Sequence, residues 1–128
     1  MRVLYVDDEE PNRRVIGSML KRAGIEMAEA GDADTGLWMI AAQKFDLVLM
    51  DVRMPGKDGL SAIREIRAHE DGKQDVPIIV ITADDAYDIR VRARAVGAND
   101  VLIKPVTKEQ LFQAIGGVVA GWGGPKAA

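Results

Sequence analysis

Four short, nearly continuous apolar runs limit this chain to a small set of folds. They cover residues 3–6, 47–50, 78–81 and 101–103. Runs of this length, without polar alternation, are typical of strands that are buried on both faces of a parallel sheet. A weaker segment at residues 25–28 alternates apolar and polar side chains, which indicates an edge strand with one face in water. The pattern therefore predicts a five-stranded sheet.

Stretches with helical periodicity separate these runs. They cover residues 11–23, 32–42, 58–68, 85–96 and 107–119. Gly24 and Gly97 directly follow two of them, as expected where a helix ends. Strands that alternate with helices predict a doubly wound α/β domain, with helices on both faces of a parallel sheet. We assign this domain to residues 1–120 and expect the glycine-rich residues 121–128 to be a flexible tail.

Composition excludes several classes of protein. The chain has 128 residues, no cysteine and one histidine. These counts exclude a disulfide scaffold, a thiolate zinc site, a cysteine nucleophile and a site with several histidine ligands. The net charge of −3 argues against a nucleic-acid-binding surface. No apolar run approaches the roughly 18 residues of a membrane span, and the acidic residues 7–10 exclude a signal peptide. We therefore expect a cytoplasmic protein that binds neither nucleic acid nor membrane.

Polar side chains follow four of the predicted strands at their carboxyl ends. The first strand is followed by Asp7 and Asp8, the third by Asp51, the fourth by Thr82 and the fifth by Lys104. In doubly wound sheets these ends share one edge, where ligands bind. Any one of the aspartates alone is better explained as a helix cap, and the lone threonine or lysine as a cap or turn residue. Their joint occurrence at one edge favours a functional site.

The chemistry of these side chains points to a metal ion. Carboxylates this close repel one another, which raises their proton affinity unless a cation neutralises them. An all-oxygen cluster suits Mg²⁺ or Mn²⁺, and Lys104 adds a second positive charge. A metal ion beside a carboxylate and a lysine is typical of phosphoryl transfer, in which the carboxylate can be the nucleophile. Asp51 is the best candidate, because it lies between the acidic pair and Lys104.

The same residues resemble the receiver domain of two-component response regulators. The resemblance is carried by Val-Asp-Asp-Glu at 6–9, Met-Asp-Val-Arg-Met-Pro-Gly-Lys-Asp-Gly at 50–59, Ile-Thr-Ala at 81–83 and Lys-Pro at 104–105. It covers residues 1 to about 120, with four motifs in the expected order and at the expected spacing. It implies a flavodoxin-like fold with strand order 2-1-3-4-5 and five flanking helices.

The resemblance also implies which residues bind the phosphoryl group and the metal ion. Asp51 would accept a phosphoryl group from a phosphohistidine on a sensor histidine kinase or a histidine phosphotransfer protein. Asp8 would bind Mg²⁺ directly, and Asp7 would bind it through water. Asp51 and the backbone carbonyl of Arg53 would complete the protein ligands of the metal ion.

Two further residues would act on the phosphoryl group itself. Thr82 would turn its hydroxyl toward the group, and Lys104 would pair with one of its oxygens. The acyl phosphate would hydrolyse slowly, so the domain would be a phosphoacceptor rather than a turnover enzyme. Pro105 must let the chain turn while the ammonium of Lys104 points back over Asp51. Together with the resemblance, this requirement predicts a cis Lys104-Pro105 bond.

One position departs from the pattern of the family. Receivers often carry Tyr or Phe three residues before the lysine, a ring that swings inward when the threonine moves, and here the residue is Val101. Valine cannot make this movement, so the signal must reach the surface by another route. Because only residues 121–128 follow the predicted domain here, we expect no DNA-binding helix-turn-helix. We expect output through contact with an unidentified downstream protein or through onward phosphotransfer.

Two other functions fit parts of the pattern. A metal-dependent phosphatase with an aspartyl nucleophile needs an Asp-x-Asp pair on the first strand, whereas Asp7 and Asp8 are adjacent. A nucleotide-binding domain needs a glycine-rich loop after the first strand, where the acidic residues 7–10 would repel phosphates. Incubation with Mg²⁺ and a small phosphodonor separates the first two functions. Stoichiometric, slowly decaying labelling indicates a receiver, and multiple turnover of phosphomonoesters indicates a phosphatase.

Charged residues near the predicted site complete the sequence analysis. Arg13 and Arg14 in the first predicted helix are interpreted as part of a solvent-exposed face. Arg13 nevertheless lies next to the acidic pair, together with Glu9 and Asn12, where a partner that carries a phosphohistidine would have to dock. Arg53 and Asp84 each follow a site residue by two positions, so we expect them to flank the mouth of the site and to pair across it.

Overall fold

Within residues 1–126, which the computed structural model describes, five strands alternate with five helices. The elements are β1 (Arg2–Val6), α1 (Glu10–Arg22), β2 (Glu26–Ala30), α2 (Ala33–Ala42), β3 (Leu47–Met50), α3 (Gly59–Arg67), β4 (Ile78–Thr82), α4 (Ile89–Val96), β5 (Asp100–Ile103) and α5 (Lys108–Val118). All strand pairs are parallel, and the sheet order is β2-β1-β3-β4-β5. Both the doubly wound fold class and the strand order predicted from the sequence are confirmed.

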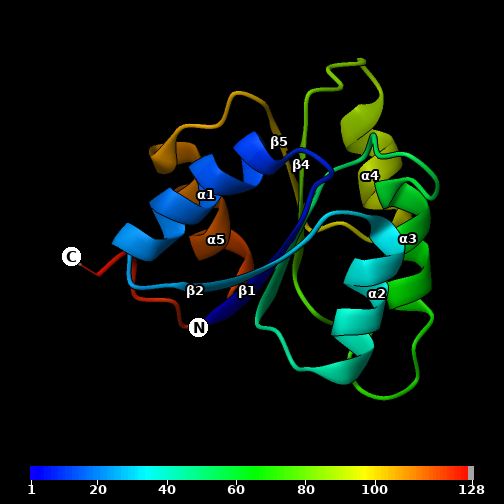
Figure 1. Cartoon of the computed structure of the whole chain (residues 1–128), viewed down its shortest axis with the longest axis horizontal. Helices are drawn as coiled ribbons and strands as arrows, with labels where there is room; N and C mark the ends of the chain where they lie inside the picture. The colour runs from blue at the N-terminus through cyan, green and yellow to red at the C-terminus, as the bar shows by residue number, and fades with distance from the viewer. Residues whose placement is uncertain (127–128) are drawn as a thin grey trace.

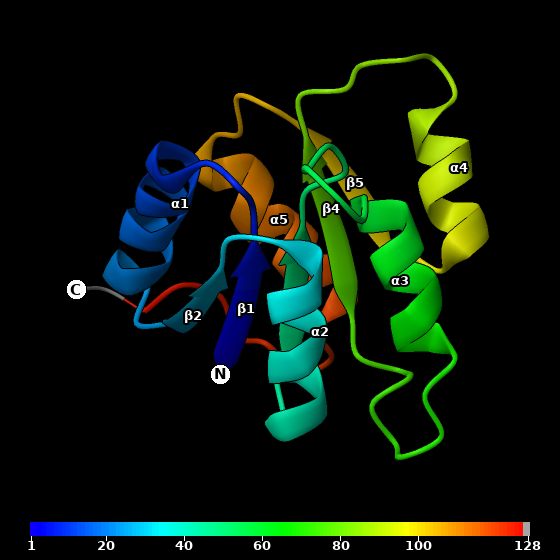
Figure 2. The same ribbon diagram turned by 45° about the vertical axis from the view of Figure 1, so that its right-hand side comes forward.

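The helices form two layers on the sheet (Figures 1 and 2). Helices α1 and α5 cover one face, and α2, α3 and α4 cover the other. Each face has its own apolar core, one built around Leu20 and Ile115 and the other around Ile63 and Ala93. Strands β3 and β4 are buried along their whole length, whereas β2 has exposed positions, as predicted for an edge strand. The apolar runs of β1, β3 and β4 therefore became buried strands. The run 101–103 differs from the prediction, because β5 lies at the other edge of the sheet and only Val101 is buried in it.

Side-chain caps explain where several helices begin. Asp32 accepts a hydrogen bond from the Thr35 N–H at the start of α2, and Asp58 accepts one from the Ser61 N–H at the start of α3. Thr107 and its neighbouring residues form a capping box at the start of α5. Each cap satisfies backbone N–H groups that have no partner inside the helix. These caps lie within one or two residues of the helix starts that the sequence predicts.

Helix α4 begins later than predicted. The helical periodicity predicts a helix over residues 85–96, but α4 starts at Ile89. The Asp84 N–H donates to Thr82 Oγ1 at 3.0 Å, and Asp84 Oδ1 accepts from the Ala86 N–H at 3.0 Å. Local bonds of this kind give the backbone an alternative to helical hydrogen bonds. Residues 83–88 therefore form a loop above the end of β4.

Arg67, the last residue of α3, joins three segments at the amino edge of the sheet. Its guanidinium donates hydrogen bonds of 2.6–3.0 Å to the carbonyl oxygens of Gln74, Val76 and Gly97 and to the side chain of Asn99. These oxygens lie before β4 and in the turn between α4 and β5. The C-terminal end of α4 is thereby fixed to α3.

The last described residues run back toward α1. The Trp122 ring packs on Phe112 of α5 with a centroid distance of 6.0 Å, and the Lys126 N–H donates to the Ala23 carbonyl at 3.0 Å. Residues 127–128 of the predicted tail lie outside the described residues, and the flexibility of the tail stays a prediction. None of the helices in residues 1–126 combines the length and the hydropathy needed to cross a membrane.

Candidate functional site

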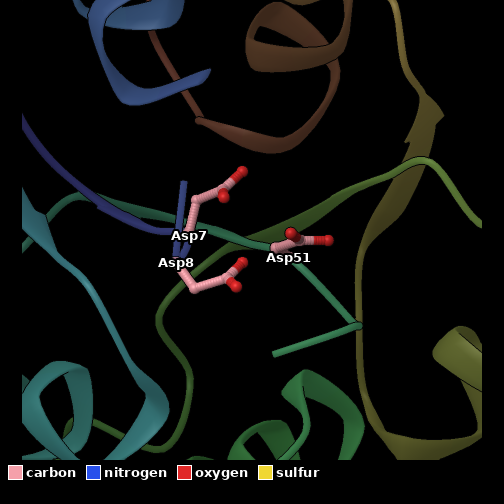
Figure 3. A group of neighbouring side chains, drawn as sticks. All are labelled: Asp7, Asp8 and Asp51. Atoms are coloured by element: carbon pink, nitrogen blue, oxygen red, sulfur yellow. The ribbon is translucent and has the colours of Figure 1, made fainter. Parts of the chain in front are cut away.

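Three carboxylates lie together at the carboxyl edge of the sheet (Figure 3). Asp7 and Asp8 follow β1, and Asp51 follows β3. Because β1 and β3 are parallel neighbours, with Val6 opposite Met50, both strands end at the same place. One carboxylate oxygen of each aspartate lies within 4.8 Å of the other two. The sheet topology thus places residues that are more than 40 positions apart in sequence at one cluster.

Asp7 is fully buried and is held by three donors. The Tyr5 hydroxyl and the Lys104 ammonium both donate to Oδ2 at 2.7 Å, and the Glu9 N–H donates to Oδ1 at 2.9 Å. Burial alone would raise the pKa of Asp7, but the hydrogen bonds from Lys104, Glu9 and Tyr5 outweigh it and hold this pKa below its ordinary value. Asp7 is therefore an ionised anchor at the base of the cluster.

Asp51 is held less strongly. The Val52 N–H donates to Oδ1 at 2.8 Å, and the Lys104 ammonium lies 3.3 Å from Oδ2. Burial raises the pKa of Asp51, the positive charge of Lys104 opposes this rise, and the negative charge of Asp7 adds to it. The net effect is a raised pKa. In the absence of a cation, Asp51 is thus the less well compensated of the two buried carboxylates.

Lys104 connects the two buried carboxylates. Its Nζ lies 2.7 Å from Asp7 and 3.3 Å from Asp51. Burial would lower the pKa of Lys104, but the hydrogen bond to Asp7 and the charges of both carboxylates raise it above the ordinary value. The ammonium therefore stays protonated inside the site. The Lys104-Pro105 bond that follows is cis, as predicted.

Asp8 is the least buried of the three aspartates, and within residues 1–126 no hydrogen bond holds its carboxylate. Its side chain turns toward Asp51 (Figure 3). The cluster offers only carboxylate oxygens as metal ligands, and both oxygens of Asp8 are free to bind a metal ion. Small, hard cations such as Mg²⁺ and Mn²⁺ prefer such donors. The donor set therefore fits a divalent cation of this class.

Thr82 ends β4, the neighbour of β3 in the sheet, and Arg53 follows Asp51 by two residues. Thr82 is fully buried at the end of β4, and its Oγ1 accepts the Asp84 N–H. The Arg53 guanidinium turns outward and bonds Asp84 Oδ2 at 3.1–3.2 Å, which confirms the predicted pair. The side chain of Arg53 is thus not brought into the carboxylate cluster. Val101, where an aromatic residue is common, is buried in the core under α4.

The interpretation of the two arginines of α1 is right for Arg14 and wrong for Arg13. The Arg14 side chain is 77% exposed and pairs with Glu10. The Arg13 side chain is only 16% exposed and donates to the Asp7 carbonyl at 2.6 Å and to Glu29 at 2.8 Å. Arg13 reaches these acceptors because α1 starts directly above the end of β1. Arg13 and Arg14 are adjacent in sequence, and the sequence alone does not show that only Arg13 is largely covered.

Two more residues of the site had no role assigned from the sequence. Tyr5 precedes Asp7 by two positions, so both side chains point to the same side of the strand, and this spacing was a usable signal. Gly59 begins α3 so close to the Asp51 backbone that an added Cβ would lie 1.9 Å from the Asp51 carbonyl oxygen. Its N–H donates to the Val52 carbonyl at 2.9 Å. Only the folded chain reveals this approach.

This doubly wound domain, with an acidic cluster of Asp7, Asp8 and Asp51 at the carboxyl edge, is of the flavodoxin-like class. The family model for the response regulator receiver domain matches residues 3–116, so the chain belongs to that family.

The chain is similar to PdtaR, a transcriptional regulatory protein of Mycobacterium tuberculosis, with 40% identity over 89% of this chain and 54% of PdtaR. It thus spans about half the length of that relative. It is 33% identical to protein PilH of Pseudomonas aeruginosa over 94% of this chain and 98% of PilH. The solved structure of the chemotaxis protein CheY4 of Vibrio cholerae superposes with a TM-score of 0.81 at 29% identity, over 89% of this chain and 94% of that one.

Proposed function

We propose that this domain accepts a phosphoryl group on Asp51 from a phosphohistidine partner, with Mg²⁺ bound at the acidic cluster. The observation that carries the proposal is the position of the Lys104 ammonium, 3.3 Å from Asp51 Oδ2 inside a cluster of three carboxylates. Asp51 Oδ1 is occupied by the Val52 N–H. Oδ2, which has only the longer contact with Lys104 at 3.3 Å, is therefore the oxygen that attacks phosphorus.

The reaction forms one bond and breaks another. Asp51 Oδ2 attacks phosphorus, the P–N bond to the imidazole of the partner breaks, and the imidazole leaves with the electron pair. Lys104 moves from the carboxylate to an oxygen of the phosphoryl group. Thr82 Oγ1 already accepts the Asp84 N–H, so its own proton is available for another phosphoryl oxygen. A divalent cation held by Asp8, Asp7, Asp51 and the Arg53 carbonyl would offset the added negative charge.

Members of the receiver family are signalling domains rather than turnover enzymes. Response regulators take their phosphoryl group from histidine kinases and act on downstream proteins. For this chain we propose a sensor histidine kinase or a histidine phosphotransfer protein as the donor. The output would be contact with a downstream protein or onward phosphotransfer. Water would slowly cleave the acyl phosphate, releasing inorganic phosphate and restoring the Asp51 carboxylate.

The decisive experiment uses phosphoramidate, a small donor with the same P–N bond as phosphohistidine. Incubation with phosphoramidate and Mg²⁺ should add one phosphoryl group per chain, measured by intact-protein mass spectrometry. The label should disappear slowly once the donor is removed, and chelation of Mg²⁺ should prevent labelling. Rapid turnover of p-nitrophenyl phosphate without a stable label would support a phosphatase instead.

The two adjacent aspartates should differ in their effect on metal binding. Asp7 is already bound by Tyr5, Glu9 and Lys104, whereas the oxygens of Asp8 are free. We expect Asp7→Ala to weaken Mg²⁺ binding about tenfold, as for an outer-shell ligand, and Asp8→Ala to weaken it more. Calorimetric titration with Mg²⁺ measures both. The reverse order would mean that Asp7, and not Asp8, binds the ion directly.

The Arg53–Asp84 pair should control the lifetime of the acyl phosphate. The pair spans the mouth of the site, which the attacking water must pass. Arg53→Ala is expected to speed the loss of the label by at most about tenfold, equivalent to roughly 1.4 kcal/mol in the barrier. Because the Arg53 side chain is 76% exposed, the free energy of unfolding should change by less than about 0.5 kcal/mol.

Asp84→Ala frees the Arg53 side chain, and the decay rate of the label then shows where this side chain goes. Decay of the label becomes slower if Arg53 then covers the phosphoryl group, and faster if Arg53 moves into solvent. Mass spectrometry at timed intervals after removal of the donor gives all three rates. Equal rates in the wild type and both variants would show that neither residue affects hydrolysis.

A further inference from the structure

Arg13 is a largely buried cation beside the acidic cluster that the proposed reaction does not use. We propose that Arg13 is a positioning residue: its guanidinium fixes the Asp7–Asp8 peptide and so directs the Asp8 carboxylate at the cation site. This inference rests on the proposed function, because it assigns Arg13 a role in the same metal site.

The contacts of Arg13 join two elements to the turn after β1. Its Nη1 donates to the Asp7 carbonyl at 2.6 Å, and its Nε donates to Glu29 Oε1 on β2 at 2.8 Å. Tyr5 and Glu29 are opposite each other in the β1–β2 register, so Glu29 lies close to the end of β1. The planar guanidinium binds both acceptors at once in one orientation. Arg13 is thus a rigid bridge from β2 to the start of the acidic pair.

Asp8 depends on this bridge more than Asp7 does. The Asp7 carboxylate has three donors of its own, whereas within residues 1–126 no hydrogen bond holds the Asp8 carboxylate. The Asp7 carbonyl and the Asp8 N–H belong to one planar peptide group. A bond that fixes this carbonyl therefore fixes the plane, and the plane sets the direction in which the Asp8 side chain leaves the backbone. The Asp7 N–H is held as well, by the Ala30 carbonyl at 3.1 Å.

A positioning role and a pure charge effect predict opposite results. If Arg13 acted only through its positive charge, it would repel Mg²⁺, so Arg13→Gln would tighten binding and Arg13→Lys would leave it unchanged. If Arg13 positions Asp8, both variants weaken binding. Lysine keeps the charge, but its single ammonium cannot reproduce the two fixed donor directions.

The test is a calorimetric titration of Mg²⁺ into the metal-free proteins. The Mg²⁺ dissociation constant should rise about tenfold in Arg13→Lys and in Arg13→Gln, the effect usual for residues that orient metal ligands. Glu29→Gln, which weakens only one side of the bridge, should raise it by a smaller factor. Arg14→Gln is the matched control, because Arg14 lies next to Arg13 on α1 but is exposed, and it should leave the constant unchanged.

Thermal unfolding of the same metal-free proteins separates positioning from stability. A merely structural Arg13 would lower the unfolding temperature of its variants without changing the Mg²⁺ dissociation constant of the folded protein, and this result would overturn the proposal. Unchanged or tighter binding in Arg13→Lys would overturn it too. If the Arg13 variants do not fold, Glu29→Gln decides, and an unchanged constant there contradicts the proposal. A wild-type protein that binds no Mg²⁺ would instead overturn the cation site of the proposed function.

Discussion

Asp51→Asn is expected to abolish labelling by phosphoramidate while leaving the fold intact. The amide has nearly the shape of the carboxylate, but it offers no nucleophilic oxygen anion. The substitution should also raise the free energy of unfolding of the metal-free protein. Burial and the charge of Asp7 already raise the pKa of Asp51, so the folded state tolerates a neutral group at this position better than an ionised one.

The pH dependence of this gain has a definite sign. A raised pKa means that ionised Asp51 costs stability above this pKa and costs nothing when the carboxyl is protonated. The advantage of Asp51→Asn should therefore be present at neutral pH and vanish as the pH falls through the pKa of Asp51. Urea unfolding at several pH values in chelator measures it. Asp85→Asn, an exposed carboxylate on the next strand-end loop, is the control and should be labelled like the wild type. A fully labelled Asp51→Asn protein would refute the assignment.

Gly59→Ala should have the largest effect on stability. The new Cβ would lie 1.9 Å from the Asp51 carbonyl oxygen and 3.0 Å from the Val52 Cα. Both contacts are with backbone, so no side-chain rotation relieves them. Helix α3 or the loop after β3 must move, and we expect a loss of about 3 kcal/mol, at the upper end for overpacking. Labelling should slow as well, because the Asp51 backbone is one of the groups displaced. Urea unfolding and timed mass spectrometry measure the two effects.

Alanine at a second glycine, Gly117, is the control and should change the free energy of unfolding in the opposite direction. Gly117 lies in α5, is exposed, and has no atom within 4 Å of an added Cβ. Gly117→Ala should therefore stabilise the protein by about 0.5–1 kcal/mol, because alanine favours helix over glycine. If both alanine variants were equally stable, the close approach of α3 to Asp51 would not be a tight constraint.

The sequence predicted those features that depend on the pattern of a single strand or helix, or on the parallel arrangement of the strands in the sheet. The buried strands followed from runs such as 78–81, because only a sheet covered on both faces accommodates them. The cluster of Asp7, Asp8 and Asp51 followed from the rule that parallel strands share their carboxyl edge. Edge strand β2 was found too, although it runs to Ala30, two residues further than predicted, because its pairing with β1 continues to the end of that strand.

Features that depend on the spacing between elements were missed. The start of α4 was wrong because Asp84 and Thr82 form local hydrogen bonds that keep residues 83–88 in a loop. The burial of Arg13 depends on how closely α1 approaches β2, and the requirement for Gly59 depends on how closely α3 approaches β3. The periodicity of apolar residues indicates which side of a helix or strand faces the core. It does not indicate the distance between neighbouring helices and strands.

The hydrogen bonds from Arg67 to the turn between α4 and β5 make the amino edge of the sheet more rigid than the carboxyl edge. At the amino edge, the Arg67 guanidinium binds uncharged carbonyl oxygens. These bonds should not change when a phosphoryl group is added at the opposite edge. At the carboxyl edge, α4 is preceded by a loop whose Asp84 is bonded to Thr82 and Arg53, close to the acidic cluster. Amide hydrogens of residues 83–88 should therefore exchange with solvent faster on phosphorylation of Asp51, while those of residues 97–99 keep their protection. The N-terminal end of α4 would then move, while its C-terminal end stays fixed to α3 by Arg67.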